Sequence, residues 1–309
     1  TVNTTNAELE WLEKDGHHIV ESGSDDFPAL LLQIPNPPER LFVVGNLDAL
    51  HLPSLAIVGS RNPTRGGEQN AYEFAKHLGG SGFCIVSGLA EGIDAAAHRG
   101  ALDGKAMTVA FLGHGIDRIY PAVNADLAGT IAQQGALCSE FPLGTPPRRE
   151  NFPQRNRLIS GLCIGTLVVE AAKRSGSLIS ARLAAEQGRE IFAIPGSIHN
   201  PMSRGCHQLI RQGAKLVESA ADIVSELGPL VQHLLQTTDA KATPPTDQFD
   251  NDHDYQLLLN ALGFDPISPD ELVEISGLTI DQVSSMLLIL ELEEKIEAQN
   301  GGRYSRLQE

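Results

Sequence analysis

The chain has 309 residues, of which 41% are hydrophobic, and a formal net charge of -16 at pH 7. This composition excludes a wholly disordered chain and is enough for two or three domains. No stretch approaches the roughly 18 consecutive apolar residues of a membrane helix, and no signal-peptide pattern opens the chain, so we expect a cytoplasmic protein with no membrane partner. The four cysteines are widely spaced and form no metal or disulfide pattern. We therefore expect no metal ion and no cofactor.

Residues 1–50 predict a lead-in to a larger domain. The stretch from Trp11 to Asn46 indicates one short helix, then a proline-rich segment with an extra strand at Leu41 to Val44. We interpret the lead-in as the remnant of a helical module plus an extension of a sheet. The chain opens on Thr1 rather than a methionine, which suggests a truncated or processed form of a longer protein.

Residues 51–236 predict a parallel sheet. Seven short apolar runs end in small or polar residues: 55–60, 84–88, 107–113, 136–140, 163–171, 190–196 and 214–219. The stretches between several of these runs have helical spacing and stop at glycine, which is typical of βαβ crossovers. The expected fold class is therefore α/β, with a doubly wound, Rossmann-like sheet.

The end of the chain predicts a second, smaller domain. A helical pattern from Ala220 to about Gln236 is followed by a polar, proline-bearing segment, 237–254, that we interpret as a linker. Residues 255–309 predict three helices and then a hairpin with a tight turn at Asn300-Gly301. This order is typical of a winged helix.

Charge is unevenly distributed along the chain. Residues 55–227 hold 17 Lys+Arg against 15 Asp+Glu, and the flanks hold 6 against 24. The segment from Arg148 to Arg189 is basic, with eight cations against three acids. The acidic total therefore does not exclude a nucleic-acid partner for the central domain. Residues 228–309 carry 4 Lys+Arg against 15 Asp+Glu, so we expect that the winged helix does not bind DNA.

Anion-binding groups follow several of the predicted strands. In an open α/β sheet, ligands lie at the carboxyl ends of the strands. Gly59–Thr64 and Ser87–Gly92 place glycines, hydroxyls and a guanidinium there, although each alone also fits a tight strand-to-helix turn. Asn151–Leu162 combines an aromatic ring with two arginines, as stacking and phosphate binding require. Glu170–Ser177 adds two cations, two hydroxyls and a glycine before a helix.

The chain contains, in this order, the motifs GSRxPT, SGLAxGID, FPxRNRxISGL, EAxxRSGSLIxA and FAxPG. With these motifs in this order and spacing, the chain resembles the DprA/Smf family of DNA-processing proteins from Phe27 to Leu307. The resemblance implies a homodimer that binds single-stranded DNA during natural transformation, when a competent cell takes DNA up. Such a protein protects the strand and loads the RecA recombinase onto it for recombination. The DNA-binding residues that the resemblance implies are Gly59, Ser60, Arg61, Thr64, Gly88, Phe152, Arg155, Asn156, Arg157, Lys173, Ser175, Gly176 and Ser177.

Two alternatives remain open beside sequence-independent binding of single strands. One is an enzyme. The dinucleotide and P-loop motifs are missing, and His98 would have to act as a base with Glu91 or Asp94. The strongest enzymatic alternative is a nucleotide-processing enzyme, because the DprA fold resembles phosphoribohydrolases of nucleoside monophosphates, which use a PGGxGT loop with a nearby glutamate. This chain has Glu170 there but no glycine pair at Arg174–Leu178. We therefore predict no enzymatic activity. The other alternative is a protein adaptor without nucleic-acid binding.

Overall fold

The computed structural model describes residues 4–239 and, in the C-terminal part, residues 257–258, 261–262, 267–279, 283, 286–287, 290, 296–299 and 303–306. The chain divides into two compact units, Thr1–Leu234 and Leu235–Glu309. Within the part that is described, no helix combines the length and the apolar character that crossing a membrane requires.

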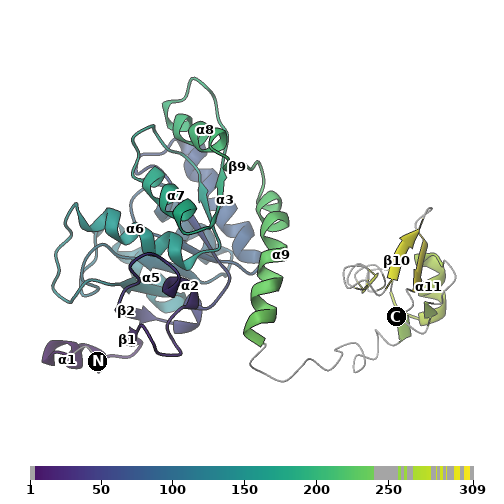
Figure 1. The fold of residues 1–309 in the computed structure, drawn as a ribbon, viewed down its shortest axis with the longest axis horizontal. Helices are drawn as coiled ribbons and strands as arrows, with labels where there is room; N and C mark the ends of the chain where they lie inside the picture. The colour runs from purple at the N-terminus through teal and green to yellow at the C-terminus, as the bar shows by residue number, and fades with distance from the viewer. Residues whose placement is uncertain are drawn as a thin grey trace. The chain divides into compact units, whose positions relative to one another are not determined.

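The described residues of the N-terminal unit form a nine-stranded sheet in the order β1-β2-β6-β5-β4-β3-β7-β8-β9. Figure 1 shows β1 and β2 at one end of this unit and β9 at the other. The strands are β1 (His17–Glu21), β2 (Arg40–Gly45), β3 (Ser54–Val58), β4 (Cys84–Ser87), β5 (Thr108–Phe111), β6 (Ala136–Ser139), β7 (Gly165–Val168), β8 (Glu190–Ala193) and β9 (Lys215–Leu216). β3 to β9 pair in parallel, whereas β1 and β2 are antiparallel. The seven expected parallel strands and the α/β fold class are confirmed.

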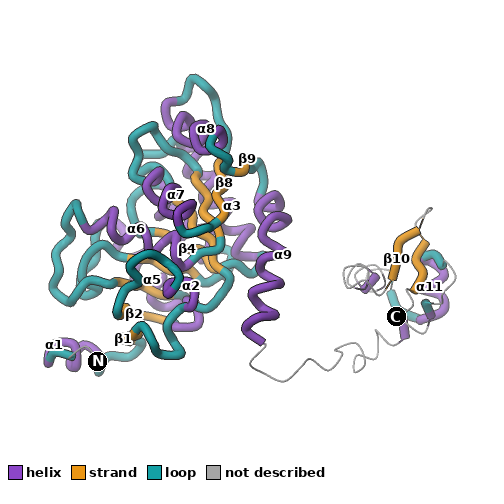
Figure 2. The backbone as a smooth tube through the Cα atoms, viewed as in Figure 1, coloured by secondary structure: helices purple, strands orange, loops and turns teal. Residues whose placement is uncertain are grey.

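Helices cover both faces of this sheet, because successive side chains of a strand point to opposite faces. Ala56 and Val58 of β3 pack in one core cluster with α2, α6, α7 and α8, whereas Leu55 and Ile57 pack in another with α3, α4 and α9. Figure 2 shows α6 and α7 in front of the strands and α3 behind them. The helices are α1 (Asn6–Leu12), α2 (Ala29–Leu32), α3 (Arg65–Gly80), α4 (Ile93–Asp103), α5 (Ala125–Gln134), α6 (Asn151–Leu162), α7 (Ser177–Glu186), α8 (Arg204–Arg211) and α9 (Ala220–Asp239), with short 3-10 turns at Leu47–Leu50, Ala122–Asn124 and Pro201–Ser203.

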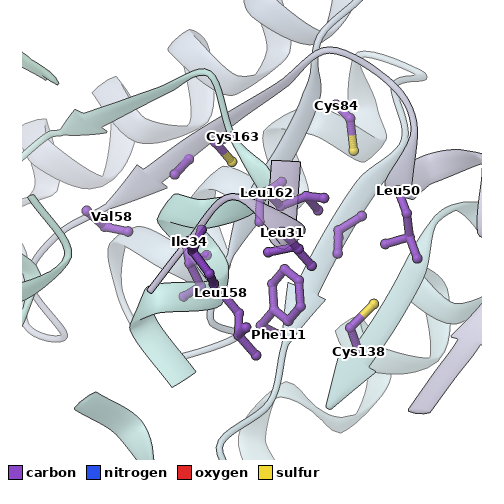
Figure 3. Packing of buried hydrophobic residues seen from close by; sticks show 14 of the residues in the cluster. Leu31, Ile34, Leu50, Val58, Cys84, Phe111, Cys138, Leu158, Leu162 and Cys163 are labelled. Carbon is purple, nitrogen blue, oxygen red and sulfur yellow. The ribbon is translucent and has the colours of Figure 1, made fainter. Parts of the chain in front are cut away.

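The core under α6 holds this helix firmly against the sheet. Figure 3 shows Leu158 and Leu162 of α6 beside Leu31 of α2 and Phe111 of β5. All four side chains are at most 2% exposed. Burying one such side chain contributes roughly 1.5–3 kcal/mol. This packing holds α6, whose first turns carry Phe152 and Arg155, against the sheet.

The lead-in differs from the expectation in its detail. The sequence predicted one extra strand, and the structure has two, β1 and β2. β1 was missed because it lies at the edge of the sheet, where only Val20 of its five residues is buried, so it has little apolar alternation. The predicted short helix after Trp11 is also misplaced, since α1 ends at Leu12 and begins before Trp11.

The described residues of the C-terminal unit include α11 (Pro269–Ser276) and the antiparallel pair β10 (Ile296–Gln299) and β11 (Arg303–Arg306). Ser268 is the N-cap of α11, and its hydroxyl accepts from Glu271 N–H. Val283, Met286, Leu287 and Leu290 are buried in one cluster with Ile296. The Asn300-Gly301 turn and most of the predicted 237–254 linker lie outside the described residues. Residues 237–239 belong to α9.

Candidate nucleic-acid interface

A pocket of about 240 Å³ opens at the carboxyl ends of the central parallel strands. It is lined by Arg61, Asn62, Gly88, Ala90, Glu91, Tyr120, Pro121, Phe152 and Arg155. Four residues expected from the sequence, Arg61, Gly88, Phe152 and Arg155, are thus brought together from three separate segments. The location follows the rule for ligands in open α/β sheets.

Aromatic and cationic groups meet at this pocket. The Phe152 ring centroid lies 6.0 Å from that of Tyr120 and 5.5 Å from the Arg61 guanidinium carbon. A Cβ on Gly113 would lie 2.8 Å from Phe152 Cδ1, so only glycine admits the ring here. Arg61 is exposed and Phe152 is half-buried. This arrangement can stack a base and contact a phosphate.

Tyr120 was not identified from the sequence. It lies in the loop after β5 and is 46% exposed. The same rule that selected the other loops would have found it, because residues 112–121 also follow a parallel strand and contain two glycines. Asn62, Ala90, Glu91 and Pro121 were also not selected as site residues. Ala90 is a specified residue of SGLAxGID, whereas Asn62 and Glu91 are the variable positions of GSRxPT and SGLAxGID.

Arg155 is a buried residue of the pocket lining. It is 3% exposed, and its Nη1 donates to the carbonyl oxygens of Gly88 at 2.7 Å and Phe111 at 2.5 Å. Burial lowers the pKa of Arg155 to about 10, although Asp94 opposes the shift. Burial in turn raises the pKa of Asp94, whose carboxylate accepts from the Gly88 backbone N–H at 3.1 Å. A Cβ on Gly88 would collide with the Arg155 guanidinium.

Arg157 and Asn156 lie away from the pocket lining. Arg157 forms an ion pair with Glu140, and their side chains are 15% and 10% exposed. Burial raises the pKa of Glu140, although the Arg157 guanidinium opposes this shift. Asn156 is half-buried on α6. Arg155 and Arg157, which the sequence analysis assigned to phosphate binding, are thus both engaged by groups of the protein itself.

The loop after β3 is held by its own hydrogen bonds. Ser60 is buried, and its Oγ accepts from Asn62 N–H at 3.0 Å. Thr64 caps α3, since its Oγ1 accepts from Gly67 N–H at 3.0 Å. Gly59 packs against α4, where a Cβ would lie 2.6 Å from Ile93 Cγ1. Arg61 is thus the exposed cation of a fixed loop.

The loop after β7 forms a second cationic surface beside the pocket, because β7 and β3 are neighbours. Lys173, Arg174 and Gly176 are exposed, and Ser175 is half-buried. Ser175 Oγ and Ser177 Oγ are 2.6 Å apart and hydrogen-bonded. Ser177 is the first residue of α7. This loop is absent from the pocket lining, so the expected residues form two adjacent groups.

The hypothesis of His98 as a base finds different partners. His98 is buried, and its Nδ1 lies 2.7 Å from Thr108 Oγ1, which donates to Ile85 O. Neither Glu91 nor Asp94 is its hydrogen-bond partner there. Burial lowers the pKa of His98 to about 3, with a contribution from Arg155. Among the residues that the structure describes, no cluster of three His, Cys, Asp or Glu side chains suits a metal ion.

Comparison with known proteins places this geometry in context. The sequence profile described as DNA recombination-mediator protein A matches residues 18–228, and the DprA winged helix domain matches residues 240–302. The latter confirms the predicted winged helix. Protein Smf of Escherichia coli is 45% identical over 298 residues, which cover 96% of this chain and 79% of that protein. DNA processing protein DprA of Streptococcus pneumoniae is 46% identical over 202 residues, which cover 65% of this chain and 71% of that protein.

Two solved structures are also similar. That of DNA processing protein A from Streptococcus pneumoniae has a TM-score of 0.68 and 43% identity, covering 72% of this chain and 78% of that one. That of DNA processing protein A from Helicobacter pylori, described for its single-stranded DNA binding mode, has a TM-score of 0.63 and 30% identity, covering 68% of this chain and 95% of that one.

Proposed function

Since this chain belongs to the DNA recombination-mediator protein A family, we propose that it binds single-stranded DNA through its phosphates and bases and does no chemistry on the strand. We further propose that it acts as a cytoplasmic homodimer, protects the strand during natural transformation and loads the RecA recombinase onto it.

The observation that supports this proposal most is the position of Arg61 beside Phe152 and Tyr120. The Arg61 guanidinium can contact a phosphate while the neighbouring base stacks on the Phe152 ring. Stacking of this kind contributes roughly 1–3 kcal/mol per base and tolerates any base. A duplex keeps its bases stacked inside the helix and cannot use the ring without opening. We therefore expect a preference for single strands and little discrimination among base sequences.

Binding is tested with labelled oligonucleotides of equal length and mixed sequence. Single strands should be retained on a filter, and a matched duplex should compete weakly. Phe152→Leu keeps an apolar group on α6 but removes the stacking surface, and it should lower affinity for single strands. A duplex that displaces the single strand at equal concentration would contradict the proposal.

Loading of RecA needs a separate measurement. The protein should raise the rate at which RecA covers an oligonucleotide that is first coated with a single-strand-binding protein. Phe152→Leu should reduce this rate in proportion to the loss of DNA affinity. Unchanged RecA kinetics with tight DNA binding would limit the function to strand binding.

The enzymatic alternative is tested in the same samples. A mononucleotide consumed by the protein would indicate hydrolysis. Glu170, which precedes the Arg174–Leu178 loop that such an enzyme would use for phosphate, accepts hydrogen bonds from Thr64 N and Oγ1 at 2.8 and 2.7 Å. This engagement favours a structural role. Absence of both binding and hydrolysis would favour the adaptor hypothesis.

A further inference from the structure

Glu170 joins two loops that are far apart in the sequence. It follows β7 and is 7% exposed. Its Oε2 accepts from Thr64 N–H at 2.8 Å, and its Oε1 accepts from the Thr64 hydroxyl at 2.7 Å. Both carboxylate oxygens are thus bound to a single residue at the end of the loop after β3.

The same hydroxyl also fixes the start of α3. Thr64 Oγ1 accepts from Gly67 N–H at 3.0 Å. A Cβ on Gly67 would lie 2.4 Å from Glu170 Cδ, so the carboxylate occupies the space that a side chain would need. The adjacent Gly66 is different, because a Cβ there would have only Thr64 Oγ1 nearby, at 3.8 Å. Glu170, Thr64 and Gly67 therefore form one close-packed unit.

Arg61 lies between two fixed points of its loop. Ser60 O accepts from Ile93 N–H of α4 at 3.1 Å on one side, and Thr64 is held by Glu170 on the other. Between these two points Asn62 N–H donates to Ser60 Oγ at 3.0 Å, and Arg61 is exposed. We infer that Glu170 is a positioning residue for DNA binding: through Thr64 it holds Arg61 where the guanidinium faces the Phe152 ring. This inference rests on the proposed binding of single-stranded DNA.

The charge of Glu170 and its positioning role predict opposite effects of its substitution on DNA affinity. A carboxylate near a phosphate site repels the ligand, so removal of its charge alone would strengthen binding. Loss of the hydrogen bonds to Thr64 would instead release the loop and weaken binding. Substitutions that separate the charge from the hydrogen bonds therefore distinguish the two roles.

The first test compares Glu170→Ala with Glu170→Gln. The amide can accept from Thr64 N–H and donate to Thr64 Oγ1, so glutamine keeps the loop but not the charge. We expect Glu170→Ala to lower affinity for a single-stranded oligonucleotide about tenfold, since a tenfold change is the size expected from one or two lost charge-assisted hydrogen bonds. Glu170→Gln should bind within about twofold of wild type or more tightly. Equal, increased affinities in both variants would overturn the positioning role.

The second test leaves Glu170 unchanged. Thr64→Val removes the hydroxyl at constant shape, and Thr64→Ser retains it. Gly67→Ala displaces the carboxylate, and Gly66→Ala is the matched control. Thr64→Val and Gly67→Ala should weaken binding, whereas the serine and Gly66→Ala variants should match wild type. Each variant is checked by circular dichroism melting.

A coupling measurement separates positioning from general destabilisation. If Glu170 acts through Arg61, Glu170→Ala should cost much less affinity in an Arg61→Ala background than in wild type. Additive losses would overturn the inference. Amide hydrogen exchange of Thr64 and Gly67, measured without DNA, should rise in Glu170→Ala and not in Glu170→Gln. Unchanged hydrogen exchange in Glu170→Ala would overturn the positioning role, whether or not the wild-type protein binds DNA. Failure of the wild-type protein to bind DNA would refute the proposed function and leave the exchange result to decide whether Glu170 holds the loop.

Discussion

Two groups of cations were assigned to this candidate interface from sequence motifs, and the structure gives them different surroundings. Arg155 and Arg157 of α6 are buried or paired, and their guanidinium groups contact backbone carbonyls or Glu140. Arg61 and Lys173, in the loops after β3 and β7, are exposed. The comparison teaches that the motifs of one candidate interface can supply both its internal support and its exposed contacts. Burial decides which role a guanidinium has, because a buried cation must be satisfied within the protein.

The largest difference between the groups should appear in stability. Arg155→Ala leaves the Gly88 and Phe111 carbonyls and the buried Asp94 without their cation. The free energy of unfolding should fall by about 3–5 kcal/mol, as when one partner of a buried charged network is removed. Arg61→Ala should change it by about 0.5 kcal/mol or less, as for an exposed side chain. Urea unfolding of both variants measures this, and equal stabilities would remove the distinction.

The buried contact between His98 of α4 and Thr108 of β5 should make stability respond to pH. The pKa of His98 is about 3 in the folded protein and near 6.5 in an unfolded chain. Below pH 6.5 the unfolded chain therefore gains a proton that the folded protein does not, and stability falls as the pH falls toward 3. Between pH 6.5 and 5, wild type should lose about 1.5 kcal/mol more than His98→Gln. Parallel stability curves for the two proteins would contradict the assignment.

The exposed side should respond to salt instead. Arg61→Ala and Lys173→Ala should each lower single-strand affinity by about 1 kcal/mol, roughly fivefold. Each should also reduce the slope of log affinity against log salt concentration by about 0.7, the value for one phosphate contact on a single strand. Arg182→Ala is a matched control, since this exposed arginine pairs with Glu186 on α7. If the Arg61→Ala and Lys173→Ala variants keep the wild-type slope of log affinity against log salt concentration, Arg61 and Lys173 do not contact phosphates.

The smallest effect should come from the C-terminal unit. Residues 228–309 carry 4 Lys+Arg against 15 Asp+Glu, and such a surface repels phosphates. Removal of residues 238–309 should leave single-strand affinity at low salt unchanged or slightly higher. A tenfold loss in a folded truncation would show that the winged helix holds DNA and that the cations of the N-terminal unit are not sufficient.

The architecture could largely be predicted from the sequence, because each buried parallel strand is a continuous apolar run that ends at glycine or a polar residue. The runs at 84–88 and 107–113 became β4 and β5 in this way. β1 was not predicted, since an edge strand with one buried residue has no such run.

The site was predicted less completely. The motifs selected loops that the structure brings together, since the pocket is lined in part by Arg61, Gly88, Phe152 and Arg155. They could not show that Arg155 is buried, because its burial depends on packing between α6 and the ends of β4 and β5. Tyr120 was missed for a related reason, since its approach to Phe152 joins two loops that are separate in the chain.

The sequence by itself determined the order of strands and helices, the acidic winged helix and the chemical groups available at the strand ends. These properties depend on local periodicity, turn residues and charge, which are written along the chain. Only the tertiary structure decided which cations face solvent, which hold the pocket together, and that Glu170 binds Thr64 across 106 residues. Such roles depend on contacts between distant segments, and local patterns carry no information about which segments meet.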